Sequence, residues 1–556
     1  MQEPSVTFDL GIHKSRGAFF TPAEITRFLV NWAVRKSVDS VLEPSCGDAA
    51  FLSAAAERLM ALGATRAETS RSLVGVEIHA PSVAEAERRL AREGLSATIT
   101  SGDFFDQSPQ RQFDVVVGNP PFIRYQRFAG TARANSLRAA LASGVRLTSL
   151  ASSWAAFAIH ASEFLKDDGR LGLVLPAELL SVNYAAEVRR FLLNRFTKVR
   201  LVLFENLVFP GVAEEVVLLL AEGRGKSINF EVYQAQDAAS LKSLDTSSWQ
   251  DFTPADDEKW TPALISIDAL ATYREITHGN GFSKLIEWGE TYLGSVTGNN
   301  EYFTMTAATV DRLNLDLSEV LKISPPGARH LRGLMFTSKA WNNLAEEGAR
   351  CYLFAPQPDR PSLAARAYIT AGEKAGIHKA YKCRTRSPWW RVPLVARPDL
   401  LFTYMNHERP RLTTNDAGAL VLNSLYGVRL RPGVRKLGQT SLPLASLNTV
   451  TLLGSEVVGR AYGGGLLKHE PREADLLPVP SVSLIMAVGE ELHSLSPEVS
   501  AAMSENRLLR AVELVDSIIL ERHLRLERSQ ISQLRKAREA LFNRRMSRGR
   551  IGRGEN

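Results

Sequence analysis

Four consecutive residues, Asn119, Pro120, Pro121 and Phe122, combine groups that suit chemistry on a planar nitrogen. The side-chain amide of Asn119 and the carbonyl of Pro120 supply two acceptors for the two hydrogens of an amine or amide. Such acceptors favour a tetrahedral nitrogen with a localised lone pair, which is a better nucleophile. The ring of Phe122 offers a stacking face. The structural alternative is a rigid turn at a strand end with a buried phenylalanine, because tandem prolines cannot continue a ladder.

The elements around this tetrapeptide predict an open α/β sheet. Short apolar runs that resemble buried strands cover residues 40–44, 73–77, 97–100, 113–118, 170–176, 199–204 and 215–221. Helical patterns at 49–62, 83–93 and 152–165 alternate with them. This alternation is typical of a doubly wound, mostly parallel sheet of seven strands. Ligands of such sheets bind beyond the carboxyl ends of the strands, where Asn119 stands.

Two acids end the first two predicted strands, one βαβ unit apart. Glu77 suits a ribose, because one carboxylate accepts both hydroxyls. Taken singly, Glu43 and Glu77 are more often solvated strand-end residues. The loop after the first strand, Ser45-Cys46-Gly47-Asp48, is not GxGxxG, which disfavours a dinucleotide. Cys46 has no activating base nearby in sequence, so we expect a packing residue.

The order of these motifs resembles the class I S-adenosylmethionine-dependent amino-methyltransferases, specifically the DNA adenine-N6 enzymes of restriction-modification systems. The gamma-type motif order, with a C-terminal target-recognition domain, is similar. The resemblance implies a Rossmann-like sheet, S-adenosylmethionine as cofactor and a flipped-out adenine. It assigns to the cofactor Phe20, Thr21, Pro22, Glu43, Ser45, Gly47, Glu77, Asp103 and Phe104, to catalysis Asn119, Pro120, Pro121 and Phe122, and to the flipped base Phe209. Many members carry tyrosine at the position of Phe122, but stacking needs only a π-face.

Composition sets further limits. The chain has 556 residues, a net charge of +7 and three distant cysteines. We expect several domains, neither a disulfide framework nor a metal site, and a reducing cytoplasm. No membrane span or secretory signal is apparent. From Glu521 to the last residue given, the sequence has eleven Lys and Arg residues and four Glu residues. The positive charge is consistent with a polyanionic partner.

We expect three domains along the chain: a catalytic domain at residues 1–230, a mixed α+β recognition domain at 231–485, and a helical, basic segment at 486–556. Residues 234–257 are polar and resemble a linker or an excursion between domains. One segment interleaves cations and aromatics, which suits phosphate contact and base packing; its candidate residues are Lys382, Arg384, Arg386, Trp389 and Trp390. The alternative is a surface strand with a tryptophan pair in a local core. Residues 460–468, with three glycines, suit either close approach to a partner or a hinge.

The resemblance implies a monomer acting on double-stranded DNA, with a separate cognate restriction endonuclease. The first motif begins at Phe19, which we interpret as leaving no room for an N-terminal nuclease. Three alternatives stay open: methylation of RNA adenine, methylation of a protein glutamine, and a non-catalytic DNA-binding specificity component. The recognised base sequence cannot be read from one chain.

Overall fold

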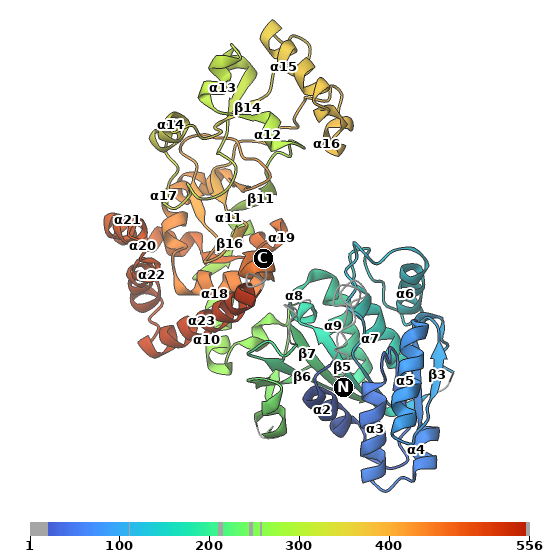
Figure 1. The fold of residues 1–556 in the computed structure, drawn as a ribbon. Helices are drawn as coiled ribbons and strands as arrows, with labels where there is room; N and C mark the ends of the chain where they lie inside the picture. The colour runs from blue at the N-terminus through green and yellow to red at the C-terminus, as the bar shows by residue number, and fades with distance from the viewer. Residues whose placement is uncertain (1–20, 111, 210–214, 244–247, 256–257, 552–556) are drawn as a thin grey trace, which may run out of the picture. The chain divides into compact units, whose positions relative to one another are not determined.

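A large sheet organises the first part of the molecule (Figure 1). Within the described residues it has nine strands in the order β3-β2-β1-β4-β5-β7-β6-β8-β9. The strands are β1 (Val41–Glu43), β2 (Leu73–Glu77), β3 (Thr98–Ser101), β4 (Phe113–Gly118), β5 (Leu165–Pro176), β6 (Phe196–Phe204), β7 (Val216–Arg224), β8 (Phe230–Ala235) and β9 (Gln250–Phe252). Pairing is parallel from β3 through β5 and between β6 and β8. Strand β7 runs antiparallel to β5 and β6, and β9 to β8.

The structure is a computed structural model that describes residues 21–110, 112–209, 215–243, 248–255 and 258–551. The chain forms two compact units, Met1–Leu264 and Ile265–Asn556. The sequence placed the first boundary at residue 230, earlier than this division.

Two groups of helices flank the sheet of the first unit. Helices α2, α3 and α5 pack on one another, and α6, α7 and α9 form the second group. The helices are α2 (Ala23–Ala33), α3 (Ala50–Ala61), α4 (Arg66–Ser72), α5 (Ala80–Arg92), α6 (Gly130–Ala142), α7 (Ser153–Glu163), α8 (Glu178–Ser181) and α9 (Ala186–Arg195), with short 3₁₀ turns at Phe104–Asp106, Asn183–Ala185, Ala239–Ser243 and Thr261–Leu264. Residues 171–176 and 216–221 are buried throughout, as expected of central strands covered on both faces. The doubly wound, mostly parallel sheet expected from the sequence is therefore confirmed, but the expected number of seven strands was wrong, because the described residues form nine.

The expected linker at 234–257 was wrong in part, because β8 and β9 extend the sheet through this region. Three buried aromatic residues explain the difference. The ring of Phe230 lies 5.1 Å from that of Phe252 and 4.3 Å from that of Trp260, measured between centroids. Burying these rings attaches the polar segment to the sheet edge.

Within its described residues, the second unit contains four small sheets. Their strand orders are β11-β18-β15-β17, β12-β14-β13, β16-β20-β19 and β10-β21. The strands are β10 (Phe282–Lys284), β11 (Gly289–Leu293), β12 (Thr304–Met305), β13 (Val320–Lys322), β14 (Tyr352–Phe354), β15 (Leu400–Phe402), β16 (Met405–Asn406), β17 (Leu412–Thr414), β18 (Tyr426–Leu430), β19 (Arg460–Tyr462), β20 (Leu466–Lys468) and β21 (Pro478–Pro480). The α-helices are α10 (Ile267–His278), α11 (Leu285–Trp288), α12 (Asn300–Phe303), α13 (Ala307–Arg312), α14 (Ser338–Glu346), α15 (Leu363–Lys374), α16 (Tyr381–Arg384), α17 (Arg435–Ala445), α18 (Thr449–Val458), α19 (Pro471–Asp475), α20 (Val482–Ser494), α21 (Ser496–Ser504), α22 (Leu508–Asp516) and α23 (Arg528–Ile551).

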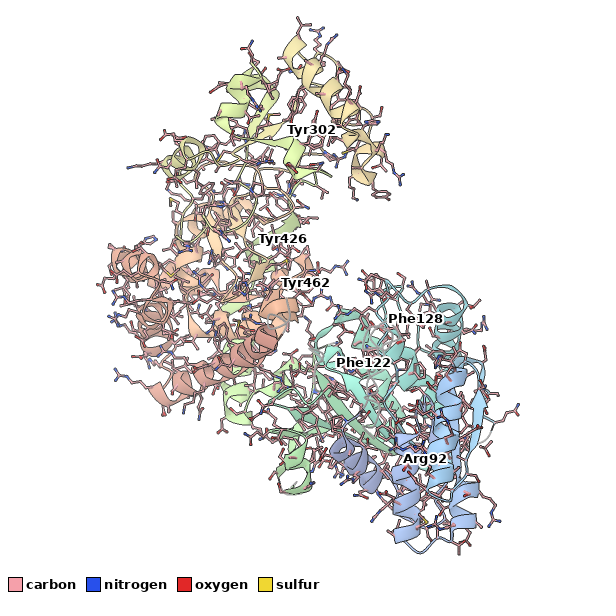
Figure 2. All side chains as sticks on the ribbon, in the orientation of Figure 1. Arg92, Phe122, Phe128, Tyr302, Tyr426 and Tyr462 are labelled. Atoms are coloured by element: carbon pink, nitrogen blue, oxygen red, sulfur yellow. The ribbon has the colours of Figure 1, made fainter. Side chains whose placement is uncertain are left out.

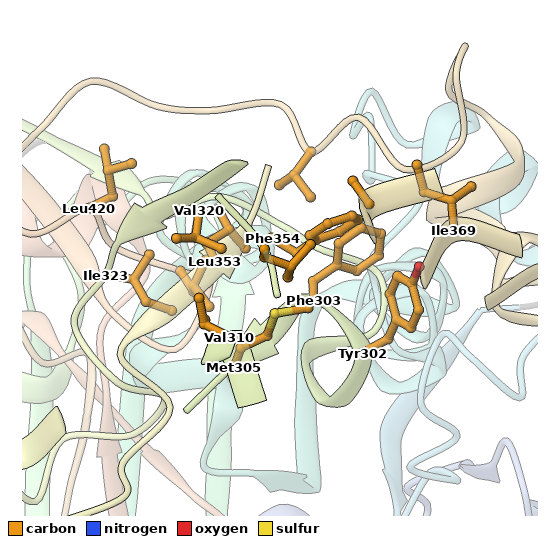
Figure 3. Close-up of a cluster of buried hydrophobic side chains, with 14 of the residues drawn as sticks. Tyr302, Phe303, Met305, Val310, Val320, Ile323, Leu353, Phe354, Ile369 and Leu420 are labelled. Carbon is orange, nitrogen blue, oxygen red and sulfur yellow. The ribbon is translucent and has the colours of Figure 1, made fainter. Parts of the chain in front are cut away.

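A lobe with its own core lies between β11 and β18, which pair with each other. Figure 3 shows its central cluster, in which Phe303, Leu353 and Phe354 are fully buried. The chain leaves through β11 and returns through β18, while β15 and β16 of the same segment pair with β18 and β20, so the lobe is joined to the remainder of the second unit by several strands.

The C-terminal part is helical, as expected. Helices α22 and α23 are separated by a π-helical turn, Ser517–His523. A buried ion pair joins α23 to α18: Arg545 Nη2 lies 2.7 Å from Glu456 Oε1. No helix in the described part of the chain is long and apolar enough to cross a membrane.

Candidate active site

The carboxyl ends of β1, β2, β3 and β4 meet at one edge of the first unit's sheet. Parallel pairing places Glu43 beside Gly75, and Glu77 beside Ser101. Strand order reverses between β1 and β4, which are neighbours although β2 and β3 separate them in sequence. Such a reversal opens a crevice for a ligand. Most of the residues predicted for the cofactor and for catalysis therefore start from one edge.

Glu77 is held in place by backbone groups. Its Oε2 accepts a hydrogen bond from Gly47 N at 2.9 Å, and its Oε1 accepts one from His79 N at 2.8 Å. Gly47 has φ +50°, and a Cβ built on it would meet nothing within 4 Å. The backbone conformation, and not crowding, therefore favours glycine here. Each carboxylate oxygen keeps a second lone pair for a hydroxyl donor.

Glu43 faces inward. It is 3% exposed, and its Oε2 accepts a hydrogen bond from Leu52 N at 3.1 Å, near the start of α3. Burial, followed by the negative charge of Asp48, raises the pKa of Glu43 well above its usual value. We conclude that Glu43 positions the loop and helix after β1.

Cys46 is a packing residue, as expected. A Cβ on Gly75 of β2 would lie 3.0 Å from its Sγ, so the glycine and the thiol fit together. Burial raises the pKa of the Cys46 thiol, which keeps it protonated and unreactive.

Asn119 forms hydrogen bonds with the segment before α2 and with the loop after β1. Its Nδ2 donates to Thr21 Oγ1 at 3.1 Å, and Ser45 Oγ lies 3.5 Å from the carbonyl oxygen of Asn119. Phe122, labelled in Figure 2, is 8% exposed. The structure thus brings together Thr21, Ser45 and Asn119 from separate motifs. Phe20 lies outside the described residues.

Asp103 and Phe104 follow β3. Asp103 Oδ1 accepts a hydrogen bond from Phe105 N at 3.0 Å and caps a 3₁₀ turn. The ring of Phe104 is buried against two residues of α7: it stacks on Phe157 at 5.6 Å and meets His160 edge-on at 4.8 Å between centroids. Phe105 is only partly buried. The Phe104 ring therefore packs in the core against α7, where the sequence had predicted a ring facing the cofactor.

The first turn of α7 holds the loop that contains the tetrapeptide. Ser153 Oγ donates to the carbonyl of Pro121 and accepts a hydrogen bond from Ile123 N at 2.9 Å. Ser153 N donates to the carbonyl of Ile123 at 3.0 Å. Ser153 is 1% exposed, so water does not compete for these bonds.

The next residue of α7 reaches the loop after β5. Trp154 Nε1 donates to Tyr184 Oη at 3.0 Å, and Tyr184 Oη donates to Glu178 Oε2 at 2.5 Å. Burial, followed by the charge of Glu178, raises the pKa of Tyr184, so its hydroxyl stays a donor. Consecutive residues of α7 therefore connect the segments that follow β4 and β5.

Sequence reasoning missed both Ser153 and Glu178. A serine at a helix start normally indicates a cap, yet Ser152, the N-cap of α7, makes no side-chain cap bond. No sequence signal distinguishes Ser153. Glu178 could have been found from the sequence, because it is an acid close to the carboxyl end of a predicted strand, as are Glu43 and Glu77.

Phe209 of the first unit and five residues of the second unit were also predicted to bind the substrate. Phe209 is buried, at the margin of the described residues. In the second unit, Arg386 Nη1 donates to the carbonyl of Thr297 at 2.8 Å. Trp389 and Trp390 pack against the core of Figure 3. Lys382 and Arg384 are exposed, and both lie over the ring of Tyr381.

The fold and site together define a class. An open sheet with β7 antiparallel between β5 and β6, and an Asn-Pro-Pro-Phe loop after β4, is the arrangement expected of an amino-methyltransferase. Among the described residues, no three His, Cys, Asp or Glu side chains gather to hold a metal ion.

Comparison with known families makes the assignment specific. The N-6 DNA Methylase family matches residues 8–290, and the C-terminal domain of the type II methyltransferase M.Eco57I matches residues 257–520. The chain belongs to the N-6 DNA methylase family, and the expected family is confirmed.

Similar proteins support the match along the chain. The type II methyltransferase M.XamI of Xanthomonas campestris pv. amaranthicola is 25% identical over 87% of this chain and 89% of its own. The type II methyltransferase M.AccI of Acinetobacter calcoaceticus is 21% identical over 84% of this chain and 86% of its own. The type IIL restriction-modification enzyme MmeI, solved in complex with DNA, shares the fold with a TM-score of 0.54 at 11% identity, over 94% of this chain and 75% of that one.

The Ser153 contacts predict a catalytic defect. Ser153→Ala leaves Pro121 O and Ile123 N without their buried partner, and small shifts of a reacting group cost on the order of 10²-fold in rate. We expect kcat for DNA methylation to fall by about 10- to 100-fold, measured by methyl incorporation at saturating DNA. Ser162→Ala is the control, because Ser162 is equally buried on α7 and its hydroxyl donates only to Ala158 O at 2.8 Å. Equal kcat in the two variants would contradict the role of Ser153.

The raised pKa of Glu43 predicts a pH-dependent stability difference. The folded state binds the proton more tightly than the unfolded state, so wild-type protein loses stability as pH rises from about 4.3, the unfolded value, through the folded pKa. Glu43→Gln keeps an acceptor for Leu52 N and removes this loss. The melting temperature of the variant relative to wild type should therefore increase from pH 5 to pH 8.

Glu231 provides a control of opposite sign. Partial burial opposes its ionisation, but Arg200 and Lys198 hold the pKa of Glu231 below its usual value. Glu231→Gln should lose stability relative to wild type as pH rises through the lowered folded pKa to about 4.3, the unfolded value, and its difference from wild type should stay nearly constant above that. A constant difference in melting temperature between Glu43→Gln and wild type from pH 5 to pH 8 would refute the account of Glu43.

Proposed function

We propose that the chain transfers a methyl group from S-adenosylmethionine to N6 of an adenine flipped out of a specific site in double-stranded DNA. The observation that carries this proposal is Asn119, held at the end of β4 by Thr21 within a family of adenine methylases. An amino nitrogen buried in a base stack must leave the duplex before it can react.

The residues at the sheet edge fit S-adenosylmethionine. Glu77 presents a carboxylate fixed by two backbone donors, suited to the two ribose hydroxyls. The backbone at Gly47 leaves open space beside it. We assign Asp103 to the amino group of the cofactor's adenine. We assign four residues to the methionine end of the cofactor: Phe20, Thr21, Pro22 and Ser45. Glu43 and Phe104 are buried and support the site without contacting the cofactor. The cofactor supplies a methyl group activated by a positively charged sulfur.

The protein activates the acceptor nitrogen. Asn119 Oδ1 and Pro120 O accept the two hydrogens of N6 and localise its lone pair, while Phe122 stacks on the base and Phe209 packs against it. The Thr21 hydroxyl fixes the rotation of the Asn119 amide, because Nδ2 already donates to it. The nitrogen forms a bond to the methyl carbon as the carbon–sulfur bond breaks, and then releases one proton to water.

The biological setting follows from the relatives. M.XamI and M.AccI are named type II methyltransferases. We assign this chain to the modification arm of a restriction-modification system, acting as a cytoplasmic monomer beside a separate endonuclease. In the proposed division, the first unit, to Leu264, carries catalysis, residues 265–485 recognise the target with Lys382 and Arg384 on the surface, and 486–556 form a helical support. Arg386, Trp389 and Trp390 organise the recognition lobe.

Asn119→Ala tests the catalytic proposal. Removing one preorganised acceptor typically lowers the rate by about 10² to 10³, so transfer of tritium from labelled S-adenosylmethionine to plasmid DNA should nearly cease. Binding of S-adenosylmethionine, measured by calorimetry, should persist. Asn229→Ala is the control, since the Asn229 side chain donates to Asp251 Oδ1 at the far edge of the sheet, at 3.0 Å.

Three outcomes would overturn the proposal. Asn119→Ala with wild-type turnover would remove Asn119 from catalysis. Wild-type protein that binds DNA without transfer would be a specificity component. Label entering RNA in preference to DNA, when both compete in one reaction, would change the substrate.

A further inference from the structure

The chain around the proposed catalytic loop lacks acidic residues. From Val115 to Ser162 there is no Asp or Glu, but there are five arginines: Arg124, Arg127, Arg133, Arg138 and Arg146. Charged residues of both signs normally mix on a protein surface. A stretch of one sign over this length favours a polyanion as its neighbour.

Two of these arginines lie on a single turn just after Phe122. Arg127 N and Phe128 N both donate to the carbonyl of Arg124, at 2.9 and 3.0 Å. We call residues 124–127 the arginine turn. All four of its side chains are exposed, including Tyr125 at 37%. Two cations with an aromatic residue between them therefore face solvent.

The arginine turn is anchored on both sides. Phe122 and Phe128, labelled in Figure 2, are 8% and 7% exposed and flank it in sequence. Ile123 is bonded through its N–H and its carbonyl to Ser153. Arg133 Nη1 donates to the carbonyl of Phe128 at 3.5 Å. Such anchoring presents the exposed groups at low entropic cost.

We propose that the arginine turn binds the DNA backbone beside the flipped adenine, with Arg124 and Arg127 on the flanking phosphates and Tyr125 against the adjoining sugar. This inference rests on the proposed function. A base stacked on Phe122 is joined through one sugar to two phosphates, and the arginine turn carries the first exposed cations after that ring. Arginine is well suited to this task, because its planar fork matches phosphate oxygens.

The salt dependence of DNA binding tests the proposal. Each phosphate contact contributes about 0.9 to the slope of log affinity against log salt concentration, so two contacts contribute about 1.8. The probe is linearised plasmid DNA from a host without DNA methylation. Half-saturating enzyme concentration is measured in single-turnover methylation over a series of KCl concentrations. For Arg124→Ala/Arg127→Ala we expect weaker saturation and a slope smaller by about 1.8.

Two further variants make the result specific. Arg124→Lys/Arg127→Lys keeps the charge and should keep most of the slope. Arg92→Ala removes an exposed arginine at the end of α5 and should match wild type. The single variants Arg124→Ala and Arg127→Ala, each expected to lower the slope by about 0.9, serve if the double variant does not fold.

An unchanged slope in the alanine variants, or an equal fall in Arg92→Ala, would overturn the proposal. Failure of the proposed function is distinguishable, because wild-type protein would then transfer no label. The slopes would still be measurable by equilibrium binding of the same DNA.

Discussion

Parallel pairing of β1 with both β2 and β4 is the constraint on which the rest of the site depends. Parallel strands end at the same edge, and the register pairs Leu42 with Val74 on one side and with Val116 on the other. A shift by one residue would reverse every side chain on a strand. Such a shift in β4 would separate Asn119 from Thr21, and in β2 it would separate Glu77 from Gly47. Apolar strands buried on both faces fix this pairing more firmly than any contact in the site.

The loops beyond the strands need separate support, since they lie outside the ladder. Helix α7 supplies it from one turn: Ser153 binds the loop after β4, and Trp154 reaches Glu178 and Tyr184 after β5. Ser153 and Trp154 are themselves buried, while Ile123, Glu178 and Tyr184 are partly exposed. The same turn therefore determines where the tetrapeptide and the neighbouring arginine turn are placed relative to the sheet.

Much of the first unit could be predicted from the sequence, because its signals are local. Apolar runs marked the strands, and residues such as Glu77 and Asn119 directly follow or end them. Contacts distant in sequence could not be predicted. Phe104 resembled an adenine-facing ring, but residues of α7 bury it, and Glu43 turned inward to Leu52. In the second unit, Arg386 and Trp389 had the pattern of a nucleic-acid contact, yet backbone carbonyls and a local core engage them.

The central claim is that the strand-end asparagine directs a methyl group to the exocyclic nitrogen of adenine. Nucleoside analysis tests it most directly: purified protein is incubated with tritiated S-adenosylmethionine and unmethylated plasmid DNA, and the DNA is digested to nucleosides and separated. The account predicts label in N6-methyldeoxyadenosine alone. Label in a methylated cytosine, or DNA without label, would contradict it.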